Sequence, residues 1–346
     1  MIRVAVHRAG GYDRLVVEEA REPLPTLDEV RVRVRAIGVN YADCVVRMGL
    51  YQSAREYVGW PIVPGFEVAG TIDAIGSSVD DVRVGDPVIA VTRFGGYASS
   101  VVVPRHQCFA LPRGMSMEEG AAFPAVFLTA HYALHGLARV RAGDTILVHS
   151  AAGGVGGALV QLGKRAGCRV VGVVGSPAKL DAARALGCDD VIVKGRDLEA
   201  RARALCPRGY DVICDANGAR SLRQSYALLA SPGKLIVYGF HTMLPRSTGG
   251  RPGRPSPVQL ARTWLATPRF DPLDMTSANK SVLALNLSYL VERRDLLEES
   301  MRDLIAGFES GALRAPTITT FPLTRAADAH RAIESGGTIG KLVLVP

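Results

Sequence analysis

The chain lacks long apolar runs and paired cysteines, and each absence excludes a class of protein. None of its 346 residues belongs to an uninterrupted apolar run of the ~18 residues that a membrane-spanning helix needs, and the first residues carry no signal-peptide pattern. The six cysteines are scattered without a C-x-x-C pair, which favours reduced thiols and argues against a zinc-ribbon site. We therefore expect a cytoplasmic protein without a transmembrane segment.

The chain also lacks the clustered basic residues of a nucleic-acid-binding protein. Its net charge of +8 comes mostly from arginine, but the arginines are dispersed and no aromatic side chains are interleaved with them. An apolar content of 48% with 21% charged residues describes a globular protein, and the length is sufficient for two domains. The excess positive charge suits an anionic small molecule, such as a nucleotide or a CoA ester.

The central part of the chain has the pattern of a dinucleotide-binding unit. An apolar strand at 145–149 is followed by a glycine-rich turn, a helix at 158–166 and a second apolar strand at 169–174. Glycines at such a turn let the backbone approach a pyrophosphate beside the N–H groups of the helix N-terminus. The pattern is A-x-G-x-x-G, with alanine in place of the usual first glycine, and a tight turn without ligand is the alternative. The predicted cofactor contacts here are Ala151, Gly153, Gly154, Val155 and Gly156.

No acidic residue follows the second strand before Asp181. An acid there would hold the ribose 2′-hydroxyl of NAD and would repel a 2′-phosphate. The chain instead places Ser176 and Lys179 after that strand, and Lys194 ends the next predicted strand. A hydroxyl and two cations suit a phosphate, so the sequence favours NADPH over NADH. The alternative for each lysine is an ordinary solvated charge.

The rest of the chain divides into a β-rich part and an α/β part. Up to about residue 122, short strands separated by Gly, Pro and Asp turns indicate a compact, partly open barrel, with strands at 30–34, 68–75, 87–91 and 97–103. A helical pattern begins at residue 117, and strands then alternate with helices as in a doubly wound parallel sheet. The strands are expected at 190–193, 211–215, 234–238 and 281–287, and the helices at 177–186, 198–205, 219–229 and 294–309. The tail has strands at 317–321 and 341–345 around a helix at 326–334.

Several segments resemble the medium-chain dehydrogenase/reductase superfamily, and within it the quinone oxidoreductase branch. They are residues 38–43, 49–51, 64–70 and 151–156, and residues 261–264 and 340–346 are most similar to the vesicle amine transport protein homologues. The resemblance implies a GroES-like catalytic domain at 1–122, completed by 311–346, and a Rossmann NADPH-binding domain at 123–310. It also implies an active site in the cleft that faces the nucleotide domain, and a homodimer formed through the edge strand at 281–287.

The resemblance also shows where a catalytic zinc would lie. Zinc alcohol dehydrogenases use a Cys, a His and a second Cys, and the matching positions here are Asn40, Phe66 and Ala125, none of which ligates zinc. The four-cysteine lobe of the structural zinc is absent as well. We therefore predict no metal. A substitute cluster stays open only if the fold assembles its residues, Asp43, Cys44, Glu67 and His131.

Without a Lewis acid to polarise a ketone, the resemblance implies NADPH-dependent reduction of an activated alkene. The substrate class would be a quinone, an enone or an enoyl thioester such as an enoyl-CoA. Tyr51 matches a tyrosine often proposed as proton donor or enolate stabiliser, and the alternative is a packed aromatic residue. Asn40 and Asp43 would lie near the nicotinamide and the substrate, although Asp43 suits a helix cap equally well.

The resemblance implies further cofactor contacts at strand ends and on the linking helix. They are Thr129, Asn217, Gly239, Phe240, Asn286 and Lys341, the last near the adenosine phosphate or simply in the closing strand. A core hydroxyl, a turn or a surface role competes for each.

The basic segment 245–272, with five arginines, is either a lid that attracts an anionic tail or a solvated loop. Two other functions stay open: a zinc-dependent alcohol dehydrogenase, and an NADPH-binding adaptor or membrane-associated protein without turnover.

Overall fold

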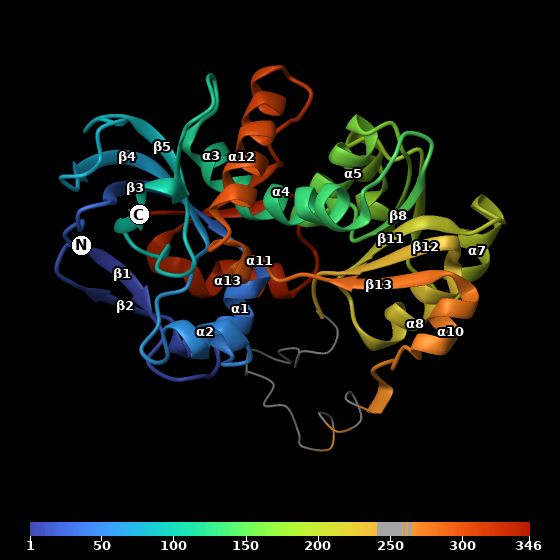
Figure 1. Ribbon diagram of the computed structural model, residues 1–346. Coiled ribbons are helices and arrows are strands. Elements are labelled where there is room, and N and C mark those ends of the chain that lie inside the picture. The colour runs from blue at the N-terminus through green and yellow to red at the C-terminus, as the bar shows by residue number, and fades with distance from the viewer. Residues whose placement is uncertain (241–257, 259–260, 262–264) are drawn as a thin grey trace. The chain divides into compact units, whose positions relative to one another are not determined.

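The computed structural model describes residues 1–240, 258, 261 and 265–346, which fall into two compact units (Figure 1). Unit 1 comprises residues 1–128 and 287–346, and unit 2 begins at Thr129 and ends at Asn286. The predicted boundary at 310/311 differs from this division, because helix α12 (Arg294–Glu309) belongs to unit 1. Its Phe308 packs on Phe123 and Phe127, with ring centroids 4.6 and 5.0 Å apart.

Unit 1 is built on a seven-stranded sheet with the order β14-β15-β3-β4-β5-β7, in which β6 also pairs with β3, and on a two-stranded sheet β1-β2. The strands are β1 (Ile2–Ala5), β2 (Val16–Glu19), β3 (Glu29–Val39), β4 (Glu67–Ile75), β5 (Pro87–Val91), β6 (Ser100–Pro104), β7 (Cys108–Ala110), β14 (Ile318–Pro322) and β15 (Lys341–Val345). β3 shows why the sequence forms this sheet. Its alternating valines are buried, whereas Arg31 and Arg33 reach Asp73 on β4 at 2.7 and 3.0 Å.

The helices of unit 1 connect and cover these strands. They are α1 (Tyr41–Arg47), α2 (Gln52–Tyr57), α3 (Met117–Ala122), α11 (Leu287–Leu290), α12 and α13 (Ala326–Glu334), with α4 (Pro124–His131) leading into unit 2. α3 begins as the acidic residues predict, because Ser116 and Glu119 form a reciprocal capping box. α12 and α13 have the predicted bounds.

Unit 2 is a six-stranded parallel sheet with the order β10-β9-β8-β11-β12-β13, which confirms the doubly wound fold. The strands are β8 (Thr145–His149), β9 (Arg169–Val174), β10 (Asp190–Val193), β11 (Tyr210–Asp215), β12 (Leu229–Val237) and β13 (Lys280–Ala284). The helices include α5 (Gly154–Arg165), α6 (Leu180–Ala185), α7 (Leu198–Leu205), α8 (Ala219–Leu228) and α10 (Pro272–Ala278). In Figure 1, α5 lies on one side of the sheet and α8 on the other.

Several boundaries differ from the sequence prediction. β3 continues to Val39, five residues past the predicted end, and β12 begins at Leu229, five residues before the predicted start. α5 begins at Gly154, four residues before the predicted start, so the glycine-rich motif itself forms the first turn of the helix. β13 ends at Ala284, because Leu287 already starts α11. The strand predicted at 97–103 is β6 at 100–104, and Ala98 forms an isolated bridge to Arg3 instead.

The basic segment 245–272 falls largely outside the described residues, including Arg246, Arg251, Arg254 and Arg262, and so do residues 262–264 of the motif at 261–264. Arg269 is described and exposed. The lid therefore stays a prediction. Across the described part of the chain, no helix has the length and apolarity needed to cross a membrane.

Candidate functional site

The residues predicted to bind a dinucleotide in unit 2 follow the carboxyl ends of its parallel strands. The glycine-rich turn follows β8, Ser176 follows β9 and Lys194 follows β10. Asn217 follows β11, Gly239 and Phe240 follow β12, and Asn286 follows β13. Because all six strands are parallel, these ends share one edge of the sheet, which is where α/β proteins bind nucleotides.

The turn between β8 and α5 explains why alanine is accepted at Ala151. The left-handed conformation falls on Ser150, with φ of 57°, and not on Ala151. Ala151 is buried and donates its N–H to the Val173 carbonyl at 3.0 Å, tying the turn to β9. Alanine therefore meets no conformational penalty here.

The two glycines of the motif are needed for different reasons. A Cβ on Gly156 would lie 2.1 Å from the Ser150 carbonyl oxygen, so only glycine permits this approach of helix and turn. A Cβ on Gly153 would meet only that same oxygen, at 3.2 Å, and would otherwise extend into open space. The first intrahelical hydrogen bond runs from Gly157 N–H to Gly153 O at 2.7 Å. The N–H groups of residues 154–156 thus have no partner within the helix and fit a pyrophosphate.

The three residues predicted to contact a 2′-phosphate lie at neighbouring strand ends. β9 and β10 pair in register up to Val174 and Val193, and the Lys194 N–H donates to the Val174 carbonyl at 2.8 Å. Ser176 and Lys179 follow on the β9 side, where burial lowers the pKa of Lys179. Asp181, the first acid of this region, has a fully exposed side chain that pairs with Arg184 within its own helix.

Asp215, which the sequence did not single out as a site residue, organises the end of β11. Its buried carboxylate accepts hydrogen bonds from the Asn217 N–H at 2.7 Å, from Ser221 Oγ at 3.0 Å and from Ser225 Oγ at 2.9 Å. The Asp215 carboxylate therefore holds Asn217 at the edge of the sheet. An acidic residue at the end of a predicted strand can be recognised in the sequence, so Asp215 could have been predicted as a site residue. Burial lowers the pKa of the neighbouring His149, against the opposing effect of the Asp215 carboxylate. Thr129 is buried in α4, and its nicotinamide contact stays a prediction.

Unit 1 contains a hydrogen-bonded cluster around the buried Glu67, and it includes Asn40 and Ala125, two of the positions matched to zinc ligands by the resemblance. The Asn40 amide donates to Glu67 Oε1 at 2.8 Å, and the Ala125 N–H donates to Glu67 Oε2 at 2.7 Å. Lys341 pairs with Glu67 at 2.8 Å, donates to the Val39 carbonyl at 2.8 Å and also contacts Asn40 Oδ1. The ammonium of Lys341 is buried and its hydrogens are used within unit 1. The prediction of a phosphate contact does not fit this placement, whereas the alternative, a residue of the closing strand, does.

Asp43 takes the helix-cap role that the sequence offered as its alternative. Its carboxylate accepts from the Asn40 N–H at 2.7 Å, forming a capping box at the start of α1, and from the Gly65 N–H at 2.8 Å. The Tyr97 hydroxyl donates to the same carboxylate at 3.2 Å. Complete burial raises the pKa of Asp43 to about 7, against the opposing effect of these donors and of Lys341.

The raised pKa of Asp43 leads to a pH-dependent stability. The folded pKa is about 7, and the unfolded value is ~3.9, so the folded protein binds more protons between these values. Relative to Asp43→Asn, the wild type should therefore lose stability as the pH rises from about 4 to about 7, with a slope of at most about 1.4 kcal/mol per pH unit. Urea unfolding of both proteins across this range measures the effect. If the difference in unfolding free energy between the wild type and Asp43→Asn does not change with pH, the raised pKa of Asp43 is contradicted.

Tyr51 lies half-buried in an aromatic cluster. Its ring is edge-on to Phe66 and Phe94, with centroids 5.7 and 6.3 Å away. Its hydroxyl makes a hydrogen bond of 3.0 Å with Oγ of Ser288, a buried residue of α11 that the sequence analysis missed. The packed-aromatic interpretation and a phenol with an active hydroxyl are thus both compatible with this position, and Ser288 is a second hydroxyl beside it.

The residues of unit 1 do not fit a catalytic zinc ion. Asn40, Phe66 and Ala125 offer no zinc-binding side chain at the expected positions, and Glu67 is already neutralised by Lys341. The predicted substitute set (Asp43, Cys44, Glu67 and His131) does not come together in the described part of the chain; the ligand-type atoms within 4.8 Å of one another belong to Cys44, His330 and Glu334.

That second group is already saturated by protein contacts. Arg47 donates to His330 Nδ1 at 2.9 Å and to Glu334 at 2.8 Å, and the Tyr97 hydroxyl contacts His330 Nε2 at 3.0 Å. Burial raises the pKa of the Cys44 thiol.

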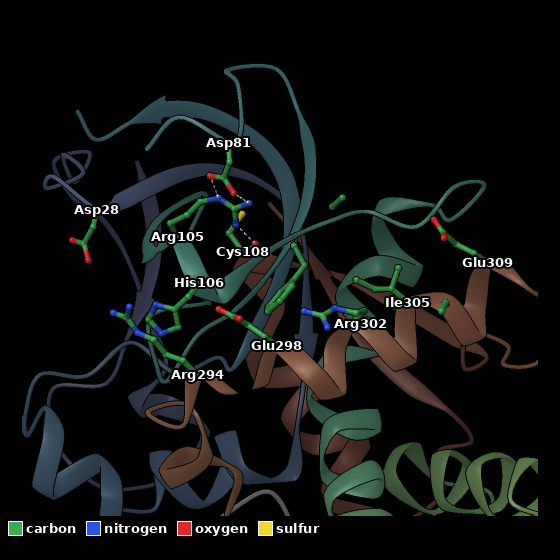
Figure 2. A pocket seen from close by; sticks show the side chains of 13 residues that line it. Asp28, Asp81, Arg105, His106, Cys108, Arg294, Glu298, Arg302, Ile305 and Glu309 are labelled. Atoms are coloured by element: carbon green, nitrogen blue, oxygen red, sulfur yellow. Dashed lines mark hydrogen bonds and ion pairs between the residues drawn. The ribbon is translucent and has the colours of Figure 1, made fainter. Parts of the chain in front are cut away.

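A surface groove of about 690 Å³ in unit 1 is lined by α12 and by the segment from Arg105 to Ala110, and Figure 2 draws the side chains that line it. Arg105 is paired with Asp81 at 2.7 Å, and α12 contributes exposed charges of both signs, Arg294, Glu298 and Arg302. Burial raises the pKa of the Cys108 thiol to about 12, which makes it unreactive. The groove therefore has neither a nucleophile nor a dominant charge that would define a ligand.

Known proteins with the same organisation were compared with the chain. The family model for the alcohol dehydrogenase GroES-like domain matches residues 26–113, and that for the zinc-binding dehydrogenase matches residues 186–344. The synaptic vesicle membrane protein VAT-1 homolog of Rattus norvegicus is 33% identical over 97% of this chain and 82% of its own length. The 2-haloacrylate reductase of a Burkholderia species is 29% identical over 100% of this chain and 99% of its own length. The crystal structure of Escherichia coli quinone oxidoreductase complexed with NADPH has a TM-score of 0.85 and 25% identity, with 100% of both chains covered.

A GroES-like unit combined with a parallel dinucleotide-binding sheet defines an oxidoreductase. The predicted fold class is confirmed in both parts. The chain belongs to the medium-chain dehydrogenase/reductase superfamily, in its quinone oxidoreductase branch.

Proposed function

We propose that this chain is a zinc-independent reductase that transfers hydride from NADPH to an α,β-unsaturated carbonyl compound. The observation that carries the proposal is the cluster of Asn40, Glu67 and Lys341. Asn40 stands at a position that matches a zinc ligand of zinc alcohol dehydrogenases, and the Glu67 carboxylate beside it is paired with Lys341. The 2-haloacrylate reductase and the quinone oxidoreductase among the relatives support an activated alkene or quinone as substrate class. Enones and enoyl thioesters such as enoyl-CoA belong to the same class by their chemistry.

The sheet edge of unit 2 would hold the NADPH. The N–H groups of residues 154–156 and the space over Gly153 suit the pyrophosphate, and Asn217, Gly239 and Asn286 lie along the same edge. The complex of the related quinone oxidoreductase with NADPH supports this cofactor. Ser176, Lys179 and Lys194 favour the 2′-phosphate, because charge-assisted hydrogen bonds to phosphate are strong.

Replacing Lys179 and Lys194 with alanine should weaken NADPH binding and spare NADH. Each lost contact between an ammonium and a phosphate should raise the Kd for NADPH about 10-fold, in line with the ~1.5–3 kcal/mol of hydrogen bonds to charged groups. Fluorescence titration with both nucleotides measures the two affinities. Lys164→Ala is the control, because Lys164 carries the same charge in unit 2 but lies in the last turn of α5, at the opposite end of that helix from the glycine-rich turn. Equal losses for NADPH and NADH would contradict a 2′-phosphate role.

The residues of unit 1 would act on the substrate oxygen. A bound NADPH would supply a hydride, and negative charge would develop on the carbonyl oxygen of the substrate as its β-carbon accepts that hydride. A hydrogen-bond donor at that oxygen lowers the barrier because it is stronger in the transition state than in the ground state. We propose Asn40, whose side-chain amide donates to Glu67, and Tyr51, whose hydroxyl lies 3.0 Å from Ser288 Oγ, as donors to this oxygen. Asp43 supports Asn40 by accepting a hydrogen bond from its backbone N–H.

The decisive test is NADPH oxidation by the purified protein against a panel of quinones, enones and enoyl-CoAs, with simple ketones and alcohols as controls. We expect turnover with unsaturated carbonyls and none with ketones. Metal analysis of the same sample tests the zinc alternative, since a stoichiometric zinc ion would contradict the proposal. Flat traces with every substrate despite tight NADPH binding would favour an adaptor without turnover. A homodimer through the edge strand β13 and a cytoplasmic location stay predictions.

A further inference from the structure

The contacts of Asn40 fix which way its side-chain amide faces. A lysine ammonium only donates hydrogen bonds, so the Asn40 atom in contact with Lys341 has to be the oxygen Oδ1. A carboxylate paired with a lysine only accepts, so the atom 2.8 Å from Glu67 Oε1 has to be the nitrogen Nδ2. Both partners demand the same orientation. The assignment therefore rests on chemistry and not on a choice between two similar atoms.

Counting hydrogens shows what this cluster leaves available. The ammonium of Lys341 has three hydrogens and three acceptors, the Val39 carbonyl, Asn40 Oδ1 and Glu67 Oε1. Asn40 Nδ2 carries two hydrogens, and one is donated to Glu67. The second has no acceptor among the residues that the structure describes. Glu67 and Lys341 are buried to within a few per cent, whereas Asn40 is half-exposed, so this hydrogen is the one that can meet a ligand.

The backbone of Asn40 is held as firmly as its side chain. Its N–H donates to Asp43, which is in turn fixed by the Gly65 N–H and by Tyr97. The Tyr97 hydroxyl is held by His330 at 3.0 Å. A donor whose backbone and amide are both fixed loses little entropy when it meets an oxygen, which is what a preorganised site requires.

We propose that Lys341 and Glu67 are positioning residues that orient the Asn40 amide, so that its free N–H donates a hydrogen bond to the substrate oxygen as that oxygen becomes an enolate. The inference rests on the proposed reductase function and assigns a role to the buried ion pair of Lys341 and Glu67. A hydride would form a C–H bond at the β-carbon, the C=C π electrons would shift to the bond between the α-carbon and the carbonyl carbon, and the C=O π electrons would move onto the oxygen, leaving NADP⁺ as the oxidised product. A proton from solvent then completes the α-carbon. Asn40 keeps its hydrogen throughout.

The test compares kcat of three proteins with the wild type, using the best substrate of the panel. Asn40→Ala removes the donor and should lower kcat about 100-fold, the usual loss for one oxyanion donor. Lys341→Met combined with Glu67→Gln keeps Asn40 but removes the two contacts that fix the orientation of its amide. A glutamine at position 67 can either donate or accept a hydrogen bond, so it tolerates both orientations of Asn40. Because both charges are removed together, no unpaired charge stays buried. This double variant should lower kcat about 10-fold, as the loss of a supporting contact does. The triple variant should be no slower than Asn40→Ala alone, because the pair acts only through that amide.

Two readouts separate positioning from a general loss of structure. The KM for the substrate and the Kd for NADPH should stay within about twofold of the wild type, because the interaction is made in the transition state. The matched control removes another ion pair that involves β4, by Arg31→Met with Asp73→Asn, and should leave kcat unchanged.

Each outcome has a definite meaning. A double variant with wild-type kcat, or a triple variant in which the two losses multiply, would overturn this inference while the reductase function stands. A double variant that changes only KM or Kd would overturn it as well. A wild type that turns over no member of the panel would overturn the proposed function, and the inference with it.

Discussion

Replacing Gly156 with alanine should abolish NADPH binding and destabilise unit 2. The added Cβ would lie 2.1 Å from the Ser150 carbonyl oxygen and 2.6 Å from its carbon, and both belong to backbone that cannot move aside. Forcing this overlap separates α5 from the end of β8, where the cofactor turn is built. Overpacking of this kind costs about 3 kcal/mol or more of unfolding free energy. Thermal unfolding with and without NADPH measures both effects.

Gly153→Ala and Gly157→Ala are the matched controls. At Gly153 the nearest atom to a Cβ is 3.2 Å away, so the fold should persist while the methyl group narrows the approach of a pyrophosphate and weakens NADPH binding. At Gly157 the Cβ would meet the end of the flexible Leu186 side chain at 3.1 Å, which can adjust. Wild-type stability and affinity for Gly156→Ala would refute the steric argument. Equal damage in all three variants would refute the distinction between them.

Replacing Arg47 with methionine should destabilise unit 1 by about 3–5 kcal/mol, the usual cost of breaking a buried ion pair from one side. The Arg47 guanidinium is 2% exposed, and it pairs with Glu334, donates to His330 and lies 4.5 Å from the centre of the Tyr12 ring. Removing it leaves the Glu334 carboxylate without its cation and His330 Nδ1 without its donor, both in buried positions. Urea unfolding measures the loss.

Arg331→Met provides a close control for Arg47→Met. Arg331 also stacks on Tyr12, at 4.8 Å from the ring centre, but it is half-exposed and pairs with Asp328. Its removal should cost less than about 1 kcal/mol, as for other surface ion pairs. If the two variants lose equal stability, burial is not what makes the Arg47 contacts strong. Arg47→Met with Glu334→Gln should recover part of the stability, because no unpaired carboxylate is left.

Hydrophobic patterning alone predicted most elements of the fold. The apolar runs at 145–149 and 169–174 and the alternating valines of β3 each identified a strand, and α12 and α13 have the predicted bounds. Such patterns are local, because a residue's burial follows from the period of its own element. The boundary of unit 1, in contrast, depends on contacts between residues that are distant in sequence. α12 joins unit 1 through Phe308, and its partners Phe123 and Phe127 lie far away in sequence.

The site residues divide in the same way. The glycine-rich turn, Ser176 and the absence of an early acid could be identified because each lies at a set distance from a strand end. Lys341 was predicted near a phosphate, yet its side chain enters the buried cluster with Glu67, and Ser288 was not recognised as the partner of Tyr51. These two pairings join residues separated by more than two hundred positions, so local sequence patterns cannot predict them.

The sequence by itself determined the dinucleotide-binding turn and the lack of zinc ligands at Asn40, Phe66 and Ala125, because residue type settles what a side chain can donate or ligate. The tertiary structure decided what those positions do instead. Antiparallel pairing of β15 with β3 brings Lys341 to Asn40, and β4 brings Glu67 to both. A buried charge persists only beside a partner, so that ion pair, and the amide it orients, exist only once the three strands have been assembled.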